Sequence, residues 1–218
     1  AAQLNAFHGT NYDITKFMRW QLAEKTTVRQ WGTAKTNWYG YDMAGVAAAY
    51  DTNDNGYAFA MNTFYPASTY VPMVRYDQSY ARAVGKWVLN IANNARYFYA
   101  DQWDEEHQTY PEFIDDPANV IAYEGFRKKH NGVEMVASGD PSVYRELWGL
   151  SEDCTDLGLY GSGFVGFLGA VVNKTNQDNI LQLDCNATDF YNDESYPTYL
   201  YYNPYDTAKT VEIKLDDY

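Results

Sequence analysis

The chain has 218 residues, enough to bury one large domain or a domain with a smaller appendage. Its formal net charge of -13 repels phosphate backbones and anionic lipid surfaces, so we do not expect a nucleic acid as a partner. No run of about 18 apolar residues occurs, and no membrane span is expected. The chain also carries 22 Tyr, 10 Phe and 6 Trp, too many tyrosines for one core that must satisfy every hydroxyl, so many of them are expected on surfaces or in a cleft.

The first predicted element is a short helix at residues 11–24, where apolar side chains recur at the spacing of one helix face. Asp13 or Thr10 stands where a helix cap is expected. The composition changes after residue 26, where an aromatic run with neighbouring glycines begins.

This aromatic run, up to residue 42, has the composition of a sugar-binding surface. Flat apolar sugar faces pack on Trp and Tyr rings, while amides and carboxylates take the hydroxyls. Packing of the tryptophans between helices explains the same residues without a ligand, and that alternative stays open. The predicted sugar-binding residues of this run are Trp38, Tyr39 and Tyr41.

Residues 51–57 alternate oxygen-bearing side chains and place a glycine sixth, like the first half of a calcium-binding loop. The twelfth place holds Asn62 instead of the bidentate Glu, so an EF-hand is excluded. A calcium site of another kind, with Asp51, Asn53 and Asn55 as ligands, is one alternative. A plain Asn-Gly turn is the interpretation that we prefer, and no cofactor is required.

Residues 57–74 are apolar and aromatic but carry two prolines, which predicts a long ordered loop. The longest helical pattern follows at residues 75–99, where apolar residues recur at intervals of three and four. Asp77 stands near its start, where a carboxylate meets free backbone N–H groups, so a cap is the simplest role for it. A loop that brings Arg75, Tyr76 and Asp77 to a helix start is also a common way to build a polar site.

The most acidic stretch, residues 101–116, contains His107. Acids beside a histidine can bind a metal or move protons, but a solvated connection between helices needs no function and is preferred. Pro117 begins a further predicted helix that ends in basic residues before an Asn131-Gly132 stop.

From residue 153 glycines alternate with bulky apolar residues, and we predict a closely packed buried helix at 163–172. The spacing of its glycines matches a dinucleotide-binding fingerprint, but no strand pattern precedes it and no βαβ unit surrounds it. One more short helical piece is predicted at 176–183.

The pattern changes to period two at residues 197–215, with a turn at 203–206, which predicts a β-hairpin. A lone hairpin is marginal in water, so it must dock on the helices or join a larger sheet. The sequence therefore predicts two parts, a helical domain at 1–190 and a hairpin of a β-rich appendage at 191–218. Because the chain stops as the second strand ends, we expect it to be a piece of a longer polypeptide. A homo-oligomer is the alternative partner that we expect.

Two cysteines, Cys154 and Cys185, permit one disulfide, and two buried free thiols are the alternative. Glycosylation triplets begin at Asn173 and Asn186. The first ten residues lack the pattern of a signal peptide, so any such signal is removed or lies upstream. The chain is rich in Tyr, Asn, Asp and Thr, poor in Lys, and has the cysteines for one disulfide. This composition fits an exported protein, which would be secreted, extracellular or periplasmic.

Several aromatic phrases stand at residues 37–42 (NWYGYD), 75–77 (RYD), 121–125 (IAYEG), 155–160 (TDLGLY) and 199–204 (YLYYNP). Together with helices separated by long loops, they resemble the later part of an (α/α) toroid carbohydrate-active protein. That group includes six-hairpin glycosidases and several polysaccharide lyases, many with an appended β-sandwich. The resemblance implies a mainly α fold, in which a partial toroid-like helical domain precedes a short β-hairpin or β-sandwich portion and loops line a cleft.

Hydrolysis of a glycosidic bond needs two carboxyls that flank the scissile oxygen. The candidate catalytic residues are Asp42, Asp77, Glu124 and Asp156, and the candidate substrate-binding residues are Trp38, Tyr39, Tyr41, Arg75, Tyr76 and Tyr160. A lyase needs instead a neutralised uronate and a Tyr or His base. Its candidates are Tyr76 or Tyr160, His107 or His8, and Arg75.

Because the negative charge disfavours a polyanionic substrate, hydrolysis of a neutral or lightly charged polysaccharide or oligosaccharide ranks first. A non-catalytic extracellular structural or glycan-binding subunit, which associates through strand edges, is the alternative from a different class.

Overall fold

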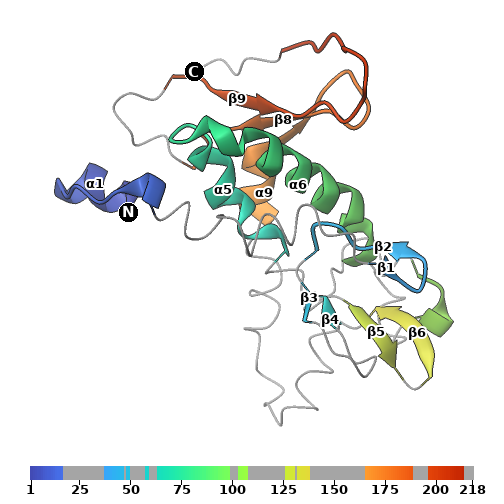
Figure 1. Ribbon diagram of the computed structural model, residues 1–218. Helices are drawn as coiled ribbons and strands as arrows, with labels where there is room; N and C mark the ends of the chain where they lie inside the picture. Colours follow the sequence, from blue (N-terminus) through green and yellow to red (C-terminus); the bar gives the residue numbers. More distant parts are fainter. Residues whose placement is uncertain are drawn as a thin grey trace. The chain divides into compact units, whose positions relative to one another are not determined.

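The computed structural model describes residues 1–16, 37–46, 48–49, 57–58, 63–98, 103–107, 126–130, 132–137, 165–188 and 196–213. The chain forms two compact units, each built from separate stretches of sequence (Figure 1). The first unit comprises Ala1–Thr33, Pro66–Leu89 and Gly166–Tyr218, and the second comprises Ala34–Tyr65 and Asn90–Val165. Within the described residues, no helix combines the length and apolar character needed to cross a membrane.

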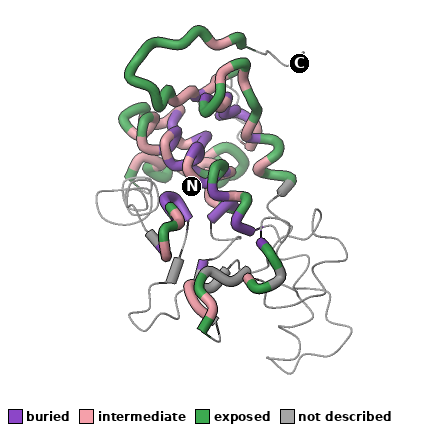
Figure 2. The backbone as a smooth tube through the Cα atoms, turned by 90° about the vertical axis from the view of Figure 1, so that its right-hand side faces the viewer, coloured by how far each residue is buried: buried purple, intermediate pink, exposed green. Residues whose placement is uncertain are grey.

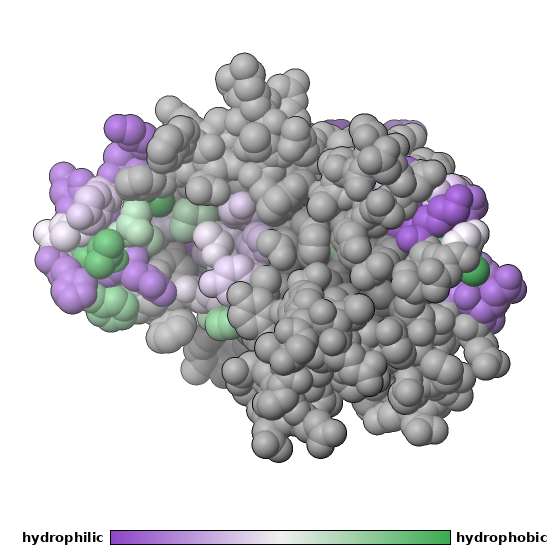
Figure 3. Space-filling model, turned by 90° about the horizontal axis from the view of Figure 1, so that it is seen from below, coloured by the Kyte–Doolittle hydropathy of each residue, from purple (hydrophilic) through white to green (hydrophobic). Residues whose placement is uncertain are grey.

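The first helix of the first unit, α1 (Ala2–His8), buries none of its residues and ends at Gly9, whose φ of +61° is the left-handed cap conformation. The space-filling view shows hydrophobic side chains among hydrophilic ones where α1 lies, at the left edge (Figure 3). Residues 14–16 are helical, and Asp13 Oδ1 accepts a hydrogen bond from the Lys16 N–H. The predicted helix at 11–24 thus begins with the predicted cap, and its remainder lies outside the described residues.

Among the described residues the longest helix is α6 (Ala81–Asn94), and it confirms the strongest helical prediction. It is preceded by a 3-10 turn, Gln78–Tyr80, and followed by another, Ala95–Phe98, so helical structure covers most of 75–99. Asp77 caps this segment, because its Oδ1 accepts from the Ser79 N–H at 3.1 Å and from the Ser79 hydroxyl at 2.6 Å. Buried and exposed residues alternate along α6 with the period of one buried face (Figure 2).

A second helix, α5 (Ala67–Met73), lies where a loop was predicted, so that prediction is wrong for these residues. The prediction weighed the two prolines too heavily. Pro66 precedes the first turn with φ −65°, which suits a helix start. Pro72 lies in the last turn, where it cannot donate the N–H that would bond the Ser68 carbonyl. The Thr188 hydroxyl donates to that carbonyl instead, at 2.5 Å.

The first unit also holds a three-stranded antiparallel sheet in the order β7 (Val172–Lys174), β8 (Leu181–Asp184), β9 (Tyr199–Tyr201). The helical piece predicted at 176–183 is therefore wrong, because a turn closed by the Thr175 hydroxyl on the Ile180 carbonyl joins two strands. The first strand of the hairpin predicted at 197–215 is confirmed as β9, but the predicted pairing is wrong, because β9 pairs with β8 and residues 211–213 form no strand.

The predicted helix at 163–172 corresponds to α9 (Val165–Val171). Among the residues of α9 whose burial is described, only Val171 is buried. The helix is therefore present, but it is not the closely packed buried helix that we expected. The core of the first unit comes from α5, α6 and the sheet, and its largest fully buried side chains are Val71, Val84, Trp87, Val88, Ile180 and Leu183.

The described part of the second unit contains two antiparallel sheets. A two-stranded hairpin joins β1 (Asn37–Trp38) to β2 (Tyr41–Asp42). A four-stranded antiparallel sheet follows the order β3 (Ala48–Ala49), β4 (Tyr57–Ala58), β5 (Phe126–His130), β6 (Val133–Ala137).

The strand β5 corrects residues 126–130 of the helix predicted from Pro117 to the basic residues before Asn131-Gly132, and the earlier part of that helix lies outside the described residues. Gly132 has φ +89°, and the strands that precede and follow it pair antiparallel, so Gly132 belongs to a hairpin rather than to a helix stop. The predicted mainly α, toroid-like fold with one terminal β-portion is therefore wrong. Antiparallel sheets occur in both units of the described chain beside the helices.

Candidate functional site

Four ring-bearing side chains of the second unit form a contiguous group, which we call the aromatic cluster: Tyr41, Tyr97, Trp103 and His107. The Tyr41 ring meets Tyr97 edge-on at a centroid distance of 5.7 Å and lies 5.4 Å from Trp103. Tyr97 and Trp103 are 5.8 Å apart, and Trp103 lies 6.3 Å from His107. These spacings are those of interacting aromatic pairs.

Local backbone geometry positions the members of this cluster. The turn between β1 and β2 uses φ +50° at Tyr39 and +94° at Gly40, which places Tyr41 on the returning strand. Tyr97 stands in the 3-10 turn after α6. The Trp103 indole N–H donates to the Tyr97 carbonyl at 3.0 Å, which holds the Trp ring against the tyrosines.

The cluster has a buried base and an accessible edge. Tyr97 and Trp103 are only 7% and 8% exposed, so they support the cluster rather than offer a surface. Tyr41 and His107 are half-buried, so part of each residue is exposed to solvent. The exposed Asp104 stands beside them.

Asp104 orients the His107 ring. Asp104 Oδ1 lies 2.6 Å from His107 Nδ1 and also accepts from the His107 backbone N–H at 3.1 Å. The hydrogen bond from His107 lowers the pKa of the Asp104 carboxyl below its ordinary value. Because an ionised carboxylate can only accept, His107 Nδ1 carries the proton in this contact, and Nε2 is the other polar atom of the ring.

Two cations lie against tyrosines of the same unit. The Arg96 guanidinium carbon is 4.5 Å from the centroid of the Tyr97 ring, and one Arg96 N–H donates to the Tyr97 hydroxyl at 2.7 Å. Lys128 Nζ lies 5.7 Å from the centroid of Tyr39.

The sequence-predicted residues of the β1–β2 hairpin have different roles. Trp38 is 3% exposed and belongs to the core, so it offers no stacking surface. Tyr39 is half-buried beside Lys128. Asp42 is exposed, and its Oδ1 accepts from the Ala44 N–H at 2.9 Å.

The three predicted residues before α6 belong to the first unit. Asp77 is the cap described above, Tyr76 is half-buried, and Arg75 lines a pocket with Cys185. Cys185 is a free, buried thiol, which agrees with the alternative of unbridged cysteines for this residue. Asp42 and Asp77 therefore belong to different units, and neither unit contains both as a catalytic pair.

Several predicted residues lie outside the described part of the chain: Glu124, Asp156 and Tyr160, the calcium candidates Asp51, Asn53 and Asn55, and Cys154. Among the described residues, no group of three or more His, Cys, Asp and Glu side chains comes together as a metal site would need. The roles predicted for the residues outside the described part of the chain stay predictions.

The sequence reasoning did not assign Tyr97 and Trp103 to a site. The density of aromatic residues just after α6, in the stretch 97–103, is the signal that could have found them. Comparisons of the chain with protein-family models, with curated proteins and with solved structures gave no significant match.

Proposed function

We propose that this protein is carbohydrate-active and binds a neutral or lightly charged polysaccharide at the aromatic cluster. The observation that carries the proposal is the half-buried Tyr41, which is held by the packed rings of Tyr97 and Trp103 and has the His107–Asp104 pair nearby. A rigid ring of this kind offers a flat apolar surface at a small cost in side-chain entropy.

The polar groups at the edge of the cluster suit the hydroxyls of a sugar. His107 Nε2 can form a hydrogen bond with a sugar hydroxyl, and the exposed Asp104 carboxylate can accept further ones. Aromatic contact with a few convergent polar groups is the usual composition of a small-molecule site.

Hydrolysis of the bound glycan is the activity that we propose first. It requires two carboxyls at a separation of roughly 5 to 10 Å. Asp42 follows Tyr41 directly and is exposed, so it is the described candidate for one of them.

Glycan binding without catalysis is the second candidate function. It is favoured by the local hydrogen bonds of Asp42 and Asp77, the two candidate catalytic carboxylates that lie in the described part of the chain. Asp42 accepts from the Ala44 N–H in a turn, and Asp77 accepts from the Ser79 N–H at the start of a helix. Both groups therefore have structural roles that need no substrate.

The binding proposal is tested by affinity electrophoresis of the full chain in gels that contain a panel of neutral polysaccharides. Tyr41→Ala should weaken binding at least about fivefold, the effect of removing an aromatic anchor worth ~1 kcal/mol. Tyr41→Phe should bind like the natural chain, because it keeps the ring. Tyr196→Ala is the matched control, because Tyr196 is 76% exposed in the first unit.

Circular dichroism of each variant separates lost binding from lost folding. Unchanged binding of folded Tyr41→Ala, or no retardation of the natural chain by any glycan of the panel, would show that the cluster is only a core. In that case the carbohydrate proposal fails.

Activity is assayed separately. Release of reducing ends that is lost in Asp42→Asn supports hydrolysis, and an unsaturated product that absorbs in the ultraviolet supports a lyase. Retarded migration with neither product identifies the non-catalytic binding protein.

A further inference from the structure

The first unit contains a pocket of about 290 Å³ between the start of α6 and the strand β9. It involves no member of the aromatic cluster, so the inference below is independent of the proposed function. Its volume is near the lower end of the ~300–1,000 Å³ that small-molecule pockets have. At about 30 Å³ per water molecule, the space suits a ligand of at most ten or so non-hydrogen atoms.

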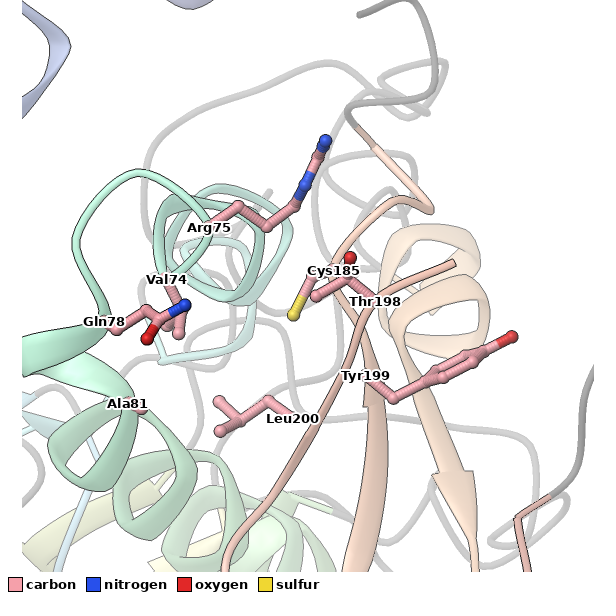
Figure 4. Close-up of a pocket in the computed structure, with 8 residues that line it drawn as sticks. All are labelled: Val74, Arg75, Gln78, Ala81, Cys185, Thr198, Tyr199 and Leu200. Atoms are coloured by element: carbon pink, nitrogen blue, oxygen red, sulfur yellow. The ribbon is translucent and has the colours of Figure 1, made fainter. Parts of the chain in front are cut away.

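The wall of this pocket is apolar. Val74 comes from the turn after α5 and Leu200 from β9, and they are 7% and 8% exposed. Figure 4 shows the Leu200 side chain and the Cys185 sulfur pointing into the space beside Val74. Ala81, the first residue of α6, lines the helix side of the same space.

The charged groups near this space do not point into it. Arg75 is the one formally charged residue among the described residues that line the pocket. Its guanidinium points away from the space between Val74, Cys185 and Leu200 (Figure 4). The buried Asp184 is next to Cys185 in sequence but is not among the lining residues.

The electrostatic surroundings of Cys185 favour a ligand without charge. Burial raises the pKa of its thiol to about 12, and Asp184 adds to this rise, whereas Arg75 lowers the pKa. The sulfur is therefore neutral near pH 7 and behaves as part of the apolar wall. Asp184 opposes an anion at this sulfur, and its Oδ1 already accepts from the backbone N–H groups of Asn186 and Ala187 at 2.7 and 3.2 Å. A charged ligand of either sign thus loses its hydration without a matching partner in the pocket.

One uncharged polar group faces the space from its helix side. The Gln78 side chain points toward it (Figure 4), and no other described residue forms a hydrogen bond with the Gln78 side-chain amide. An amide both donates and accepts hydrogen bonds, so it can pair with a hydroxyl or with another amide. Thr198, on the strand side, already donates its Oγ1 proton to the Tyr196 carbonyl at 2.8 Å.

We propose that this pocket binds a small neutral aliphatic molecule with one hydroxyl or amide head group. The aliphatic chain lies against Val74, Cys185 and Leu200, and the head group forms a hydrogen bond with the Gln78 amide. Removal of the chain from water drives binding, so the affinity rises with chain length until the space is filled.

Binding is measured on the full chain by NMR of the Val74 and Leu200 methyl groups, which belong to residues that line the pocket. Hexanol should shift both sets of resonances saturably. Butanol lacks two CH₂ groups and should bind about fifteenfold more weakly, at roughly fourfold per CH₂ group. Hexanoate and hexylammonium have the same chain length but carry a charge, and they should bind at least about tenfold more weakly than hexanol.

A variant that fills the pocket tests where hexanol binds. Ala81→Met should abolish the hexanol-induced shifts, because its longer side chain occupies the space. Ala83→Met is the matched control and should keep them, because Ala83 is a half-buried residue of the same helix that does not line the pocket.

Three results would each overturn the proposal. They are the lack of a saturable shift at Val74 and Leu200 up to the solubility limit of hexanol, equal affinity for hexanol and its charged analogues, and undiminished binding of hexanol by folded Ala81→Met. The comparison of hexanol with its charged analogues uses the natural chain, so it decides the question even if Ala81→Met does not fold.

Discussion

The hydrogen bond from Thr188 to the Ser68 carbonyl compensates for a proline inside a helix, and this can be tested by a double-mutant cycle. Pro72 removes the donor that would serve Ser68 within α5, and the Thr188 hydroxyl, from the segment after β8, replaces it at 2.5 Å. Thr188→Val keeps the shape of the side chain and removes the donor.

The expected cost follows from the environment of this bond. Loss of one partner of a buried hydrogen bond costs ~1–3 kcal/mol, and this bond is only partly buried, so we expect ~1–2 kcal/mol. For a chain of this size each kcal/mol lowers Tm by about 2–4 °C. Pro72→Ala restores an N–H that can donate to Ser68, so Thr188→Val should cost at least ~0.5 kcal/mol less in that background.

The assay is urea unfolding followed by circular dichroism and by tryptophan fluorescence, in all four variants of the cycle. Thr207→Val is the control, because Thr207 is exposed, and it should change the free energy of unfolding by no more than about 0.5 kcal/mol. An equal cost of Thr188→Val in both backgrounds, within ~0.3 kcal/mol, would refute the compensation.

Three further outcomes are expected. Gly85→Ala should destabilise the first unit by up to ~2 kcal/mol in urea unfolding, because a Cβ at this position would lie 2.6 Å from Tyr202 Cβ. Overpacking costs ~1–3 kcal/mol, which exceeds the gain of ~1 kcal/mol in helix propensity. An unchanged unfolding midpoint would contradict this prediction. Cys185 has its pKa raised from 9.0 to about 12, so its contribution to stability is complete below pH 9 and is lost as the pH rises toward 12, and Cys185→Ala should show a smaller alkaline loss of stability than the natural chain. NMR titration of the carboxyl carbon should show that the lowered pKa of Asp104 returns to its ordinary value in His107→Ala. The contribution of Asp104 to stability is present above the unfolded pKa of its carboxyl and is lost as the pH falls through the lowered, folded-state pKa. Equal titration in the two proteins would show that the contact with the imidazole is absent in solution.

The parts of the fold that the sequence predicted correctly are those that depend on near neighbours. The helix α6 forms where apolar residues recur at helical spacing, and Asp77 caps it by bonding Ser79, two residues away. Asp13 acts in the same way on Lys16. These hydrogen bonds join residues within one turn, so the local pattern of residue types is enough to predict them.

Apart from β9, whose residues the period-two pattern predicted, the described strands were missed because their stability depends on distant partners. Residues 126–130 end in basic residues before Asn-Gly, a pattern that suits a helix end and a hairpin equally, and pairing with Val133–Ala137 makes them a strand. The three residues of β9 would pair with the following segment in a local hairpin, but they pair with β8.

The candidate site shows the same division. The sequence selected Tyr41 by composition, but only tertiary structure brings it against Tyr97 and Trp103 and leaves Trp38 in the core. By itself the sequence determined the long amphipathic helix, its cap and the excess of aromatic residues, because each follows from neighbouring residues or from composition. The tertiary structure decided which rings are accessible, how the strands pair and that Arg75 and Cys185 share a pocket, because burial and strand pairing arise between residues far apart in the chain.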